Sequence, residues 1–130
     1  MFDNFLPYIT FLGTGVGLLL AAVAIYVLIT PIHEFRLIRA GNKAAAASLG
    51  GAVIGLSLPL FGVASSTFVL AELAAWGAVG VALQVGAYLI VSLALPRYRH
   101  NIESDQLSYG IAGAAFSIAV GVINAGAIAG

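Results

Sequence analysis

Residues 29–51 read ITPIHEFRLIRAGNKAAAASLGG and place a dense polar segment between two long apolar runs. The first apolar run is expected to end at Thr30, because the residue before a proline is disfavoured in the helical region. A short helix follows over about residues 32–40, and Gly41-Asn42 is its predicted stop. Apolar residues then resume at Ala44. This segment therefore predicts a short amphipathic juxtamembrane helix between two membrane-spanning helices.

The composition of the chain is typical of a membrane protein. Of its 130 residues, 62% are hydrophobic and only 8% are charged, too few to cover a soluble domain of this size. Four apolar runs each reach the roughly 20 residues that span a bilayer core. They cover about residues 5–30, 44–65, 68–95 and 109–130. Because the runs are continuously apolar, helices are favoured over barrel strands. We expect one all-α, polytopic domain over residues 1–130, with four transmembrane helices.

The charges predict how the chain is oriented. All cations fall in the two loops 31–43 and 96–106; they are Arg36, Arg39, Lys43, Arg97 and Arg99. Since cytoplasmic loops are enriched in Lys and Arg, these loops are expected in the cytoplasm, where their cations would contact anionic headgroups. Both termini are then expected outside the cytoplasm.

The N-terminal run could be mistaken for a signal peptide, because Ala22-Val23-Ala24 imitates a cleavage site. However, a signal peptide begins with a positively charged region, and this one has Asp3 and neither Lys nor Arg. The apolar run also continues to Ile29. We therefore expect the first helix to be retained.

Glu34 is the most informative ionisable residue. If residues 32–40 are helical, Arg36, Arg39 and Lys43 share one stripe, and Glu34 projects from the opposite side among apolar residues. Glu34 then either pairs with a cation or caps the segment, or it is a buried partner or gate residue beneath the bundle. The sequence leaves both interpretations open.

Further polar residues lie near or within the apolar runs. Glu72 shares a helix face with Trp76 and is either a solvated interfacial acid or an intramembrane carboxylate, which would indicate a solute path. Gln84 is expected to form an interhelical hydrogen bond. Ser104 or Asp105 is expected to cap the helix over residues 109–130.

Stripes of small residues run along three of the predicted helices. They allow close approach of another backbone, which is the usual role of small residues in membrane helices. The stripes include Gly13 and Gly17 in the first run, Gly51, Gly55, Pro59 and Gly62 in the second, and Gly110, Gly113 and Gly121, followed by Asn124, in the fourth. Pro59 also removes the hydrogen-bond donor for the Gly55 carbonyl, which predicts a kink there.

The second and fourth stripes match at a constant offset of 62 residues, from Ser48 on Gly110 to Gly62 on Asn124. The prolines that end the first and third helices, Pro31 and Pro96, are 65 residues apart instead. We interpret this as a weak internal repeat of two parallel-related helical hairpins.

An ordered set of residues resembles the signature of the YjfL-like bacterial membrane family, known as domain of unknown function 350. The set comprises Ile29-Thr30-Pro31, Glu34, Leu37-Ile38, Gly41-Asn42, residues 44–46, Leu49-Gly50, Pro59-Leu60, Glu72 with Ala75-Trp76-Gly77, Gln84 and Ile123-Asn124-Ala125. The resemblance implies a four-helix bacterial inner-membrane protein made of two related hairpins. It also adds Asn42 to the candidate polar residues, and it implies no established activity. Some relatives are encoded beside membrane-stress or polyamine-related genes.

An enzyme is the function class that the sequence disfavours most. It shows no nucleophile elbow, no metal-ligand spacing and no phosphate-binding glycine loop, and it has no cysteine. We therefore expect no catalytic residue, metal site or cofactor. Five cations in short loops also argue against nucleic-acid binding.

Two functional hypotheses remain. In the first, the chain forms a homo-oligomeric channel or small-solute permeation unit with Glu34, Glu72, Gln84 and Asn124 as polar stations. In the second, it is a non-catalytic interaction subunit of a larger membrane complex or a partner of a cytoplasmic stress protein, bound through the basic loops.

Overall fold

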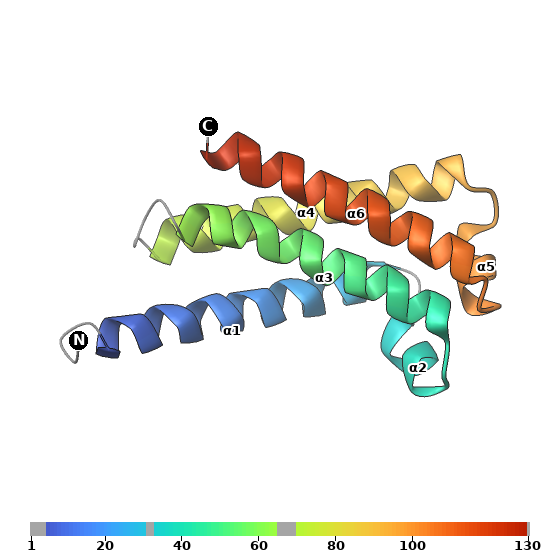
Figure 1. Cartoon of the computed structure of the whole chain (residues 1–130), viewed down its shortest axis with the longest axis horizontal. Coiled ribbons are helices and arrows are strands. Elements are labelled where there is room, and N and C mark those ends of the chain that lie inside the picture. Colours follow the sequence, from blue (N-terminus) through green and yellow to red (C-terminus); the bar gives the residue numbers. More distant parts are fainter. Residues whose placement is uncertain (1–4, 31–32, 65–69, 130) are drawn as a thin grey trace.

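The chain folds into four long helices and two short ones in the computed structural model, which describes residues 5–30, 33–64 and 70–129 (Figure 1). The helices are α1 (Phe5–Ile29), α2 (Glu34–Arg39), α3 (Lys43–Ala64), α4 (Leu70–Ala94), α5 (Tyr98–Glu103) and α6 (Leu107–Ala129). The expected turn at residues 65–67 lies outside the described residues.

The four long helices are the membrane-spanning elements. Each contains a stretch long and apolar enough to cross a bilayer. A helix of 25 residues, such as α1 or α4, is about 37 Å long, which exceeds the hydrocarbon thickness of a membrane. The protein is thus an all-α, polytopic membrane protein, as its hydropathy predicts.

The two halves of the chain repeat one pattern of long, short and long helix. Helices α1 and α4 begin 65 residues apart, and α2 and α5 begin 64 residues apart, as do α3 and α6. Each short helix is followed by a residue with positive φ, Gly41 at 92° and Asp105 at 62°. Corresponding helices run in the same direction (Figure 1). The repeat is therefore parallel, as expected, and the spacing of its helix starts is closer to the proline spacing of 65 than to the stripe offset of 62.

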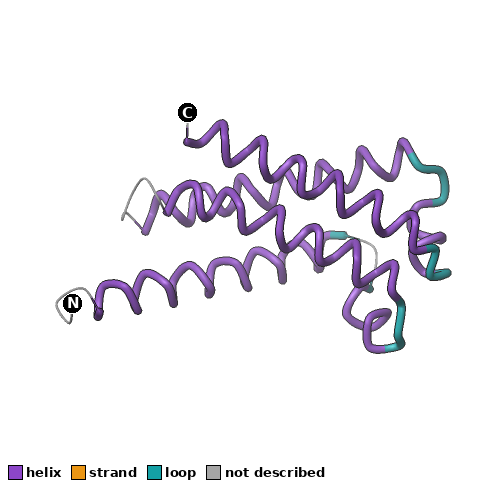
Figure 2. Tube along the Cα trace, in the orientation of Figure 1, coloured by secondary structure: helices purple, strands orange, loops and turns teal. Residues whose placement is uncertain are grey.

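Residues 96–106 were expected to form a loop, but Tyr98–Glu103 within them form the short helix α5. Both short helices and the connections around them lie at the end of the bundle opposite the two termini (Figure 2). All five cations of the chain lie at this end, in α2, in α5, just before α5 and at the first residue of α3. We call it the basic end.

Helices α3 and α6 form the centre of the bundle, where glycine lets two parallel backbones touch. A Cβ atom added at Gly110 would clash with the backbone of Ala44, and one at Gly121 would clash with the backbone of Gly55. Gly51 lies equally close to Ala114. The glycine stripes of α3 and α6 therefore face each other. Gly62 also lies in α3, but its surroundings fall outside the described residues.

Pro59 lies buried within α3, which continues beyond it to Ala64. Proline leaves the carbonyl group four residues earlier without its helical donor. That carbonyl belongs to Gly55, and its oxygen lies against Gly121 of α6. The carbonyl oxygen of Gly55, which lacks a backbone N–H donor within α3, is thus covered by α6. Close Cα–H contacts of this kind are seen between packed helices.

Helix α1 lies at the edge of the bundle. Only Ala22, Val23 and Tyr26 of α1 are buried, all in its second half. No atom lies within 4 Å of a Cβ added at Gly13, Gly15 or Gly17. Within the described part of the chain, the small-residue stripe of α1 therefore has no intramolecular partner, in contrast to those of α3 and α6.

Side chains from both halves cap α3 at the basic end. Asn42 Oδ1 accepts a hydrogen bond from Ala45 N at 2.7 Å, and Asn42 Nδ2 donates to the carbonyl of Ile102 at 2.8 Å. Asp105 Oδ1 accepts from the backbone N–H groups of Lys43 and Ala44 at 2.8 and 2.9 Å. The expectation that Asp105 caps the last helix was therefore wrong, because Asp105 reaches across to α3.

Candidate functional site

Glu34 is the buried ionisable side chain around which a candidate site is built. It is the first residue of α2 and is only 1% exposed. Neither carboxyl oxygen has a hydrogen-bond partner among the described residues. Arg36 and Arg39 of the same helix are exposed, so they do not accompany Glu34 into the interior. Of the two interpretations of Glu34, this geometry agrees with a carboxyl buried beneath the bundle. It does not agree with a carboxylate paired with a neighbouring cation.

Three buried tyrosines from three helices lie close enough for the charge of Glu34 to act on them. They are Tyr26 of α1, Tyr88 of α4 and Tyr98 of α5, all at most 8% exposed. A charge on Glu34 disfavours ionisation of the phenol of Tyr98. The rings of Tyr88 and Tyr98 meet edge to face, with centroids 5.9 Å apart. Among the described residues, the site is therefore aromatic and weakly polar, and it contains no compensating positive charge.

Burial sets the protonation of the two groups that lie outside the spanning helices. Desolvation raises the pKa of Glu34 from its ordinary 4.5 to about 7. Burial also raises the pKa of Tyr98, while the hydrogen bond with Ser48 lowers it and the charge of Glu34 raises it. The carboxyl of Glu34 can thus exchange a proton near neutral pH, whereas Tyr98 remains a neutral phenol there.

Further buried polar groups continue from this site into the membrane-spanning region. The hydroxyl of Tyr98 and Ser48 Oγ are hydrogen-bonded at 3.1 Å, beside Gly113 of α6. Gln84 Nε2 donates to the carbonyl of Ser117 at 3.0 Å, as expected for an interhelical bond. Gln84 Oε1 and Asn124 Nδ2 are buried without a partner among the described residues. A discontinuous row of polar groups therefore runs along the inner faces of α3, α4 and α6.

A polar pocket opens beside the site at the basic end. Its volume is about 520 Å³, and it is lined by Tyr88, Ser92, Arg97, Tyr98, Arg99, His100 and Glu103. Arg99 forms an ion pair with Glu103 at 2.9 Å, and Arg97 adopts a left-handed conformation just before α5. Tyr88 and Tyr98, on which the charge of Glu34 acts, thus also line this pocket.

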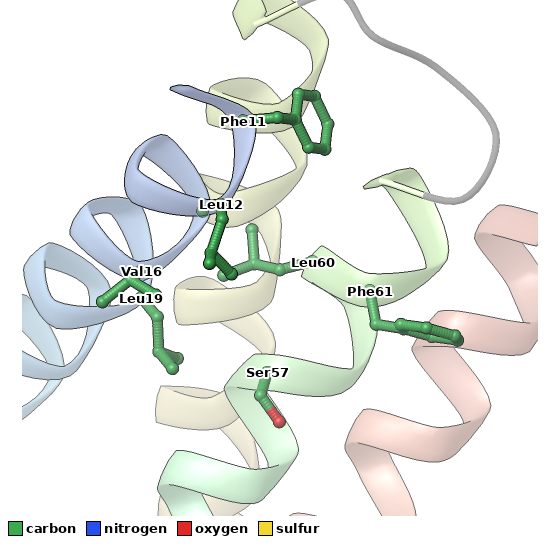
Figure 3. A pocket seen from close by; sticks show the side chains of 8 residues that line it. Phe11, Leu12, Val16, Leu19, Ser57, Leu60 and Phe61 are labelled. Carbon is green, nitrogen blue, oxygen red and sulfur yellow. The ribbon is translucent and has the colours of Figure 1, made fainter. Parts of the chain in front are cut away.

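A second, apolar pocket lies between α1 and α3 (Figure 3). Its volume is about 230 Å³, and its lining includes Phe11, Leu12 and Val16 from α1 and Leu60 and Phe61 from α3. Ser57 is its one hydroxyl-bearing residue, and that hydroxyl already donates to the carbonyl of Ile54 at 2.7 Å. This pocket has the character of a lipid-facing groove and offers no chemistry.

The comparisons with known proteins agree with this picture of a membrane protein. The profile of a family described as a Domain of Unknown Function (DUF350) matches residues 1–128. The chain belongs to this family. It is 27% identical over 123 residues to the UPF0719 inner membrane protein YjfL of Escherichia coli (strain K12), which covers 95% of this chain and 93% of that protein. The YjfL protein of Escherichia coli O157:H7 matches equally well. No solved structure matches the chain significantly.

Several residues that carried the resemblance to the DUF350 family occupy separate places in the fold. Glu34, Gln84 and Asn124 are buried inside the bundle, and Asn42 is buried in the cap of α3. Glu72 lies exposed in the first turn of α4. The described residues contain no cluster of three or more His, Cys, Asp or Glu side chains that would suit a metal ion.

Sequence reasoning on this DUF350 chain missed the tyrosines around Glu34. A signal was present, because Glu34 and Tyr98 are 64 residues apart and each begins the short helix of its half. Both loops were already expected on the same side of the membrane, and the proline spacing of 65 would have matched Glu34 with a position next to Tyr98. The stripe offset of 62 pointed away from this match.

Proposed function

We propose that this chain is a subunit of a homo-oligomeric assembly in the bacterial inner membrane, and that the assembly lets a small polar solute permeate. The location follows that of the E. coli relative, which is named an inner membrane protein. The proposal assigns no catalytic role, metal or cofactor to the chain. Its main support is the row of buried polar groups in the spanning helices.

These polar groups are costly in a membrane unless they have a use. Gln84 is 1% exposed and Asn124 is 8% exposed, and each keeps one polar atom without a partner among the described residues. Buried polar groups normally find partners, and those left unpaired within membrane spans frequently mark a solute path or bound water. Packing of α3 against α6 relies on glycine and does not require these amides. We infer that Gln84 and Asn124 serve water or a polar solute.

The free face of α1 supports the oligomeric part of the proposal. Gly13 and Gly17 form a Gly-x-x-x-Gly pair on a helix face that no other part of the described chain covers. Such pairs are typical of close contacts between membrane helices. Since the glycine stripes of α3 and α6 already face each other, the stripe of α1 is left free for a second subunit.

The orientation in this proposal follows from the basic end. All five cations are exposed there, and the positive-inside bias places them in the cytoplasm, next to anionic headgroups. The two termini, at the opposite end of the bundle (Figure 1), are then outside the cytoplasm.

The size of the particle in native lipid tests the assembly first. We expect an oligomer by mass measurement in lipid discs, and we expect Gly13→Ile with Gly17→Ile to reduce it to monomers. Ala82→Ile is the matched control, because Ala82 is an exposed small residue on a different spanning helix. A monomeric native chain would contradict the symmetric assembly.

Solute flux into liposomes then tests permeation. Gln84→Leu and Asn124→Leu are expected to lower the flux of small polar solutes while the particle keeps its size. Glu34→Gln and Glu72→Gln test the two carboxyl groups in the same assay, and Glu72, which is exposed, is expected to matter less. Native flux no faster than that of empty liposomes would rule out permeation.

The second candidate is a non-catalytic interaction subunit of a larger membrane complex or membrane-stress system. Its specific support is the exposure of Arg36, Arg39, Lys43 and Arg97, of which none forms an ion pair within the described residues. An acidic protein partner could bind there. Stoichiometric co-purification of such a partner, lost when these four residues are changed to Gln, would favour this candidate.

A further inference from the structure

The buried carboxyl of Glu34 has no positively charged partner among the described residues. Its two oxygens are buried without hydrogen-bond partners among the described residues. An ionised carboxylate in such a place loses its hydration and gains nothing in return, whereas a neutral carboxylic acid loses far less. The proton is the smallest cation that can neutralise the group, and it needs no cavity of its own.

We propose that Glu34 is an internal proton-binding site, filled and emptied from the basic end of the bundle by way of the polar pocket that Tyr88 and Tyr98 line. The site exists within a single chain, so it does not depend on oligomerisation or on permeation of any other solute. It goes beyond the proposed function by naming a ligand, the proton, and the residue that holds it.

The ionisable groups near Glu34 are consistent with a site for a proton. The groups on which its charge acts are the phenols of Tyr26 from α1, Tyr88 from α4 and Tyr98 from α5. Helix α3, which packs against α2, carries a single charged residue, Lys43, exposed in its first turn, and α6 carries no charged residue. The cations of α2 and α5 point outward. Within the described part of the chain, no fixed positive charge therefore competes with a proton for the carboxylate.

The polar pocket provides the connection to water. Tyr88 and Tyr98 form part of its wall, and the charge of Glu34 acts on both phenols. A phenol hydroxyl is both donor and acceptor. Since neither oxygen of Glu34 is hydrogen-bonded to a phenol, a water molecule has to lie between them. A hydronium ion in the pocket gives its proton to the phenol oxygen while the phenol's own proton passes through that water to the carboxylate. The hydronium becomes water, the phenol ends unchanged and the carboxylate becomes a carboxylic acid. The reverse sequence returns the proton to the pocket.

The position of Glu34 on the pH scale agrees with such a role. Desolvation brings the pKa of this carboxyl to about 7, so that both forms are populated near neutral pH. A proton site is useful to a cell when it exchanges its proton close to the working pH.

Carbon NMR of the full chain in lipid discs tests the binding of the proton directly. The chain has only three glutamates, Glu34, Glu72 and Glu103, so ¹³C labelling of glutamate carboxyl groups gives three resonances. We expect one of them to titrate between about pH 6 and about pH 8 and to be absent from Glu34→Gln. Glu72→Gln and Glu103→Gln should each remove a different resonance. A Glu34 resonance that stays in its carboxylate position throughout that range would overturn the proposal.

Thiol labelling tests the connection to water separately. Since the chain has no cysteine, Ser92→Cys reports on the pocket, and Leu93→Cys is the control on the neighbouring lipid-facing position, where the side chain is 86% exposed. A charged, membrane-impermeant thiosulfonate added at the basic end should modify the Ser92→Cys variant at least ten times faster than the Leu93→Cys variant. Equal rates, or modification of the Ser92→Cys variant from the opposite side only, would exclude the proposed route.

Discussion

At the residue scale, one pair of positions shows how the two halves differ. Glu34 and Tyr98 both begin a short helix, and both are almost completely buried. In one half the position holds an acid, and in the other it holds a phenol that is bonded to Ser48 and packed beside Gly113. Glu34 and Tyr98 therefore occupy corresponding positions in the two halves but differ in chemistry, one being an acid and the other a phenol.

The burial of Glu34 predicts how stability depends on pH. The folded pKa of about 7 lies above the ordinary 4.5, so the unfolded chain releases this proton first as pH rises. Below about pH 4.5, ionisation of Glu34 takes nothing from the free energy of unfolding. Between about pH 4.5 and about pH 7 this loss of stability grows to ~3 kcal/mol, and at higher pH it stays constant.

We therefore expect Glu34→Gln to gain stability relative to the native chain over this interval, measured by thermal unfolding in detergent. Using the difference between the two proteins removes the pH dependence of all other groups. A difference that does not change with pH would show that Glu34 does not change its protonation on folding.

Gly121 is predicted to tolerate no side chain. A Cβ there would clash with the backbone of Gly55, and overpacking of this kind costs roughly 1–3 kcal/mol. The helix propensity gained on replacing Gly by Ala is about 1 kcal/mol at most, so the clash dominates. Gly126→Ala is the control, because nothing lies within 4 Å of a Cβ at that position of the same helix. Unfolding with increasing amounts of a denaturing detergent should show a loss of stability for Gly121→Ala and no loss for Gly126→Ala.

At the element scale, hydropathy was sufficient to locate the spanning helices. The predicted run over residues 44–65 and the observed α3 (Lys43–Ala64) differ by one residue at each end, because a bilayer demands about 20 apolar residues in succession. Hydropathy could not locate α5, whose six residues YRHNIE are mostly polar. It becomes recognisable only as the counterpart of α2. Hydropathy also could not show that the stripes of α3 and α6 face each other while that of α1 stays free.

The cap on α3 gives a prediction at this scale. Asp105 Oδ1 holds two backbone N–H groups of α3 and also adopts a positive φ of 62°. Asp105→Asn keeps an acceptor and tolerates that conformation, whereas Asp105→Gly tolerates the conformation but has no acceptor. We expect Asp105→Gly to lose about 1 kcal/mol or more of stability, the usual worth of a helix cap, and Asp105→Asn to lose less. Equal losses in thermal unfolding would mean that backbone conformation, and not capping, is what Asp105 contributes.

At the scale of the whole molecule, the prediction concerns the sides of the membrane. The basic end carries all cations, so we expect both termini on the opposite, non-cytoplasmic side. Alkaline phosphatase fused to the C-terminus should be active, because it folds only outside the cytoplasm, and a green fluorescent protein fused there should be dark. Replacing all five cations by Gln is the control, and it should produce mixed orientations. A fluorescent C-terminal fusion of the native chain would contradict the orientation.

The parallel direction of the two halves has a further consequence. Transporters with inverted repeats can exchange the conformations of their halves and so open to either side by the same movement. In this chain both halves present the same kind of end to the same side, so exchanging their conformations would return an equivalent state facing the same way. The two ends of the bundle therefore differ, and the two short helices lie at the same one. Any gate built from α2 and α5 can respond to only one compartment.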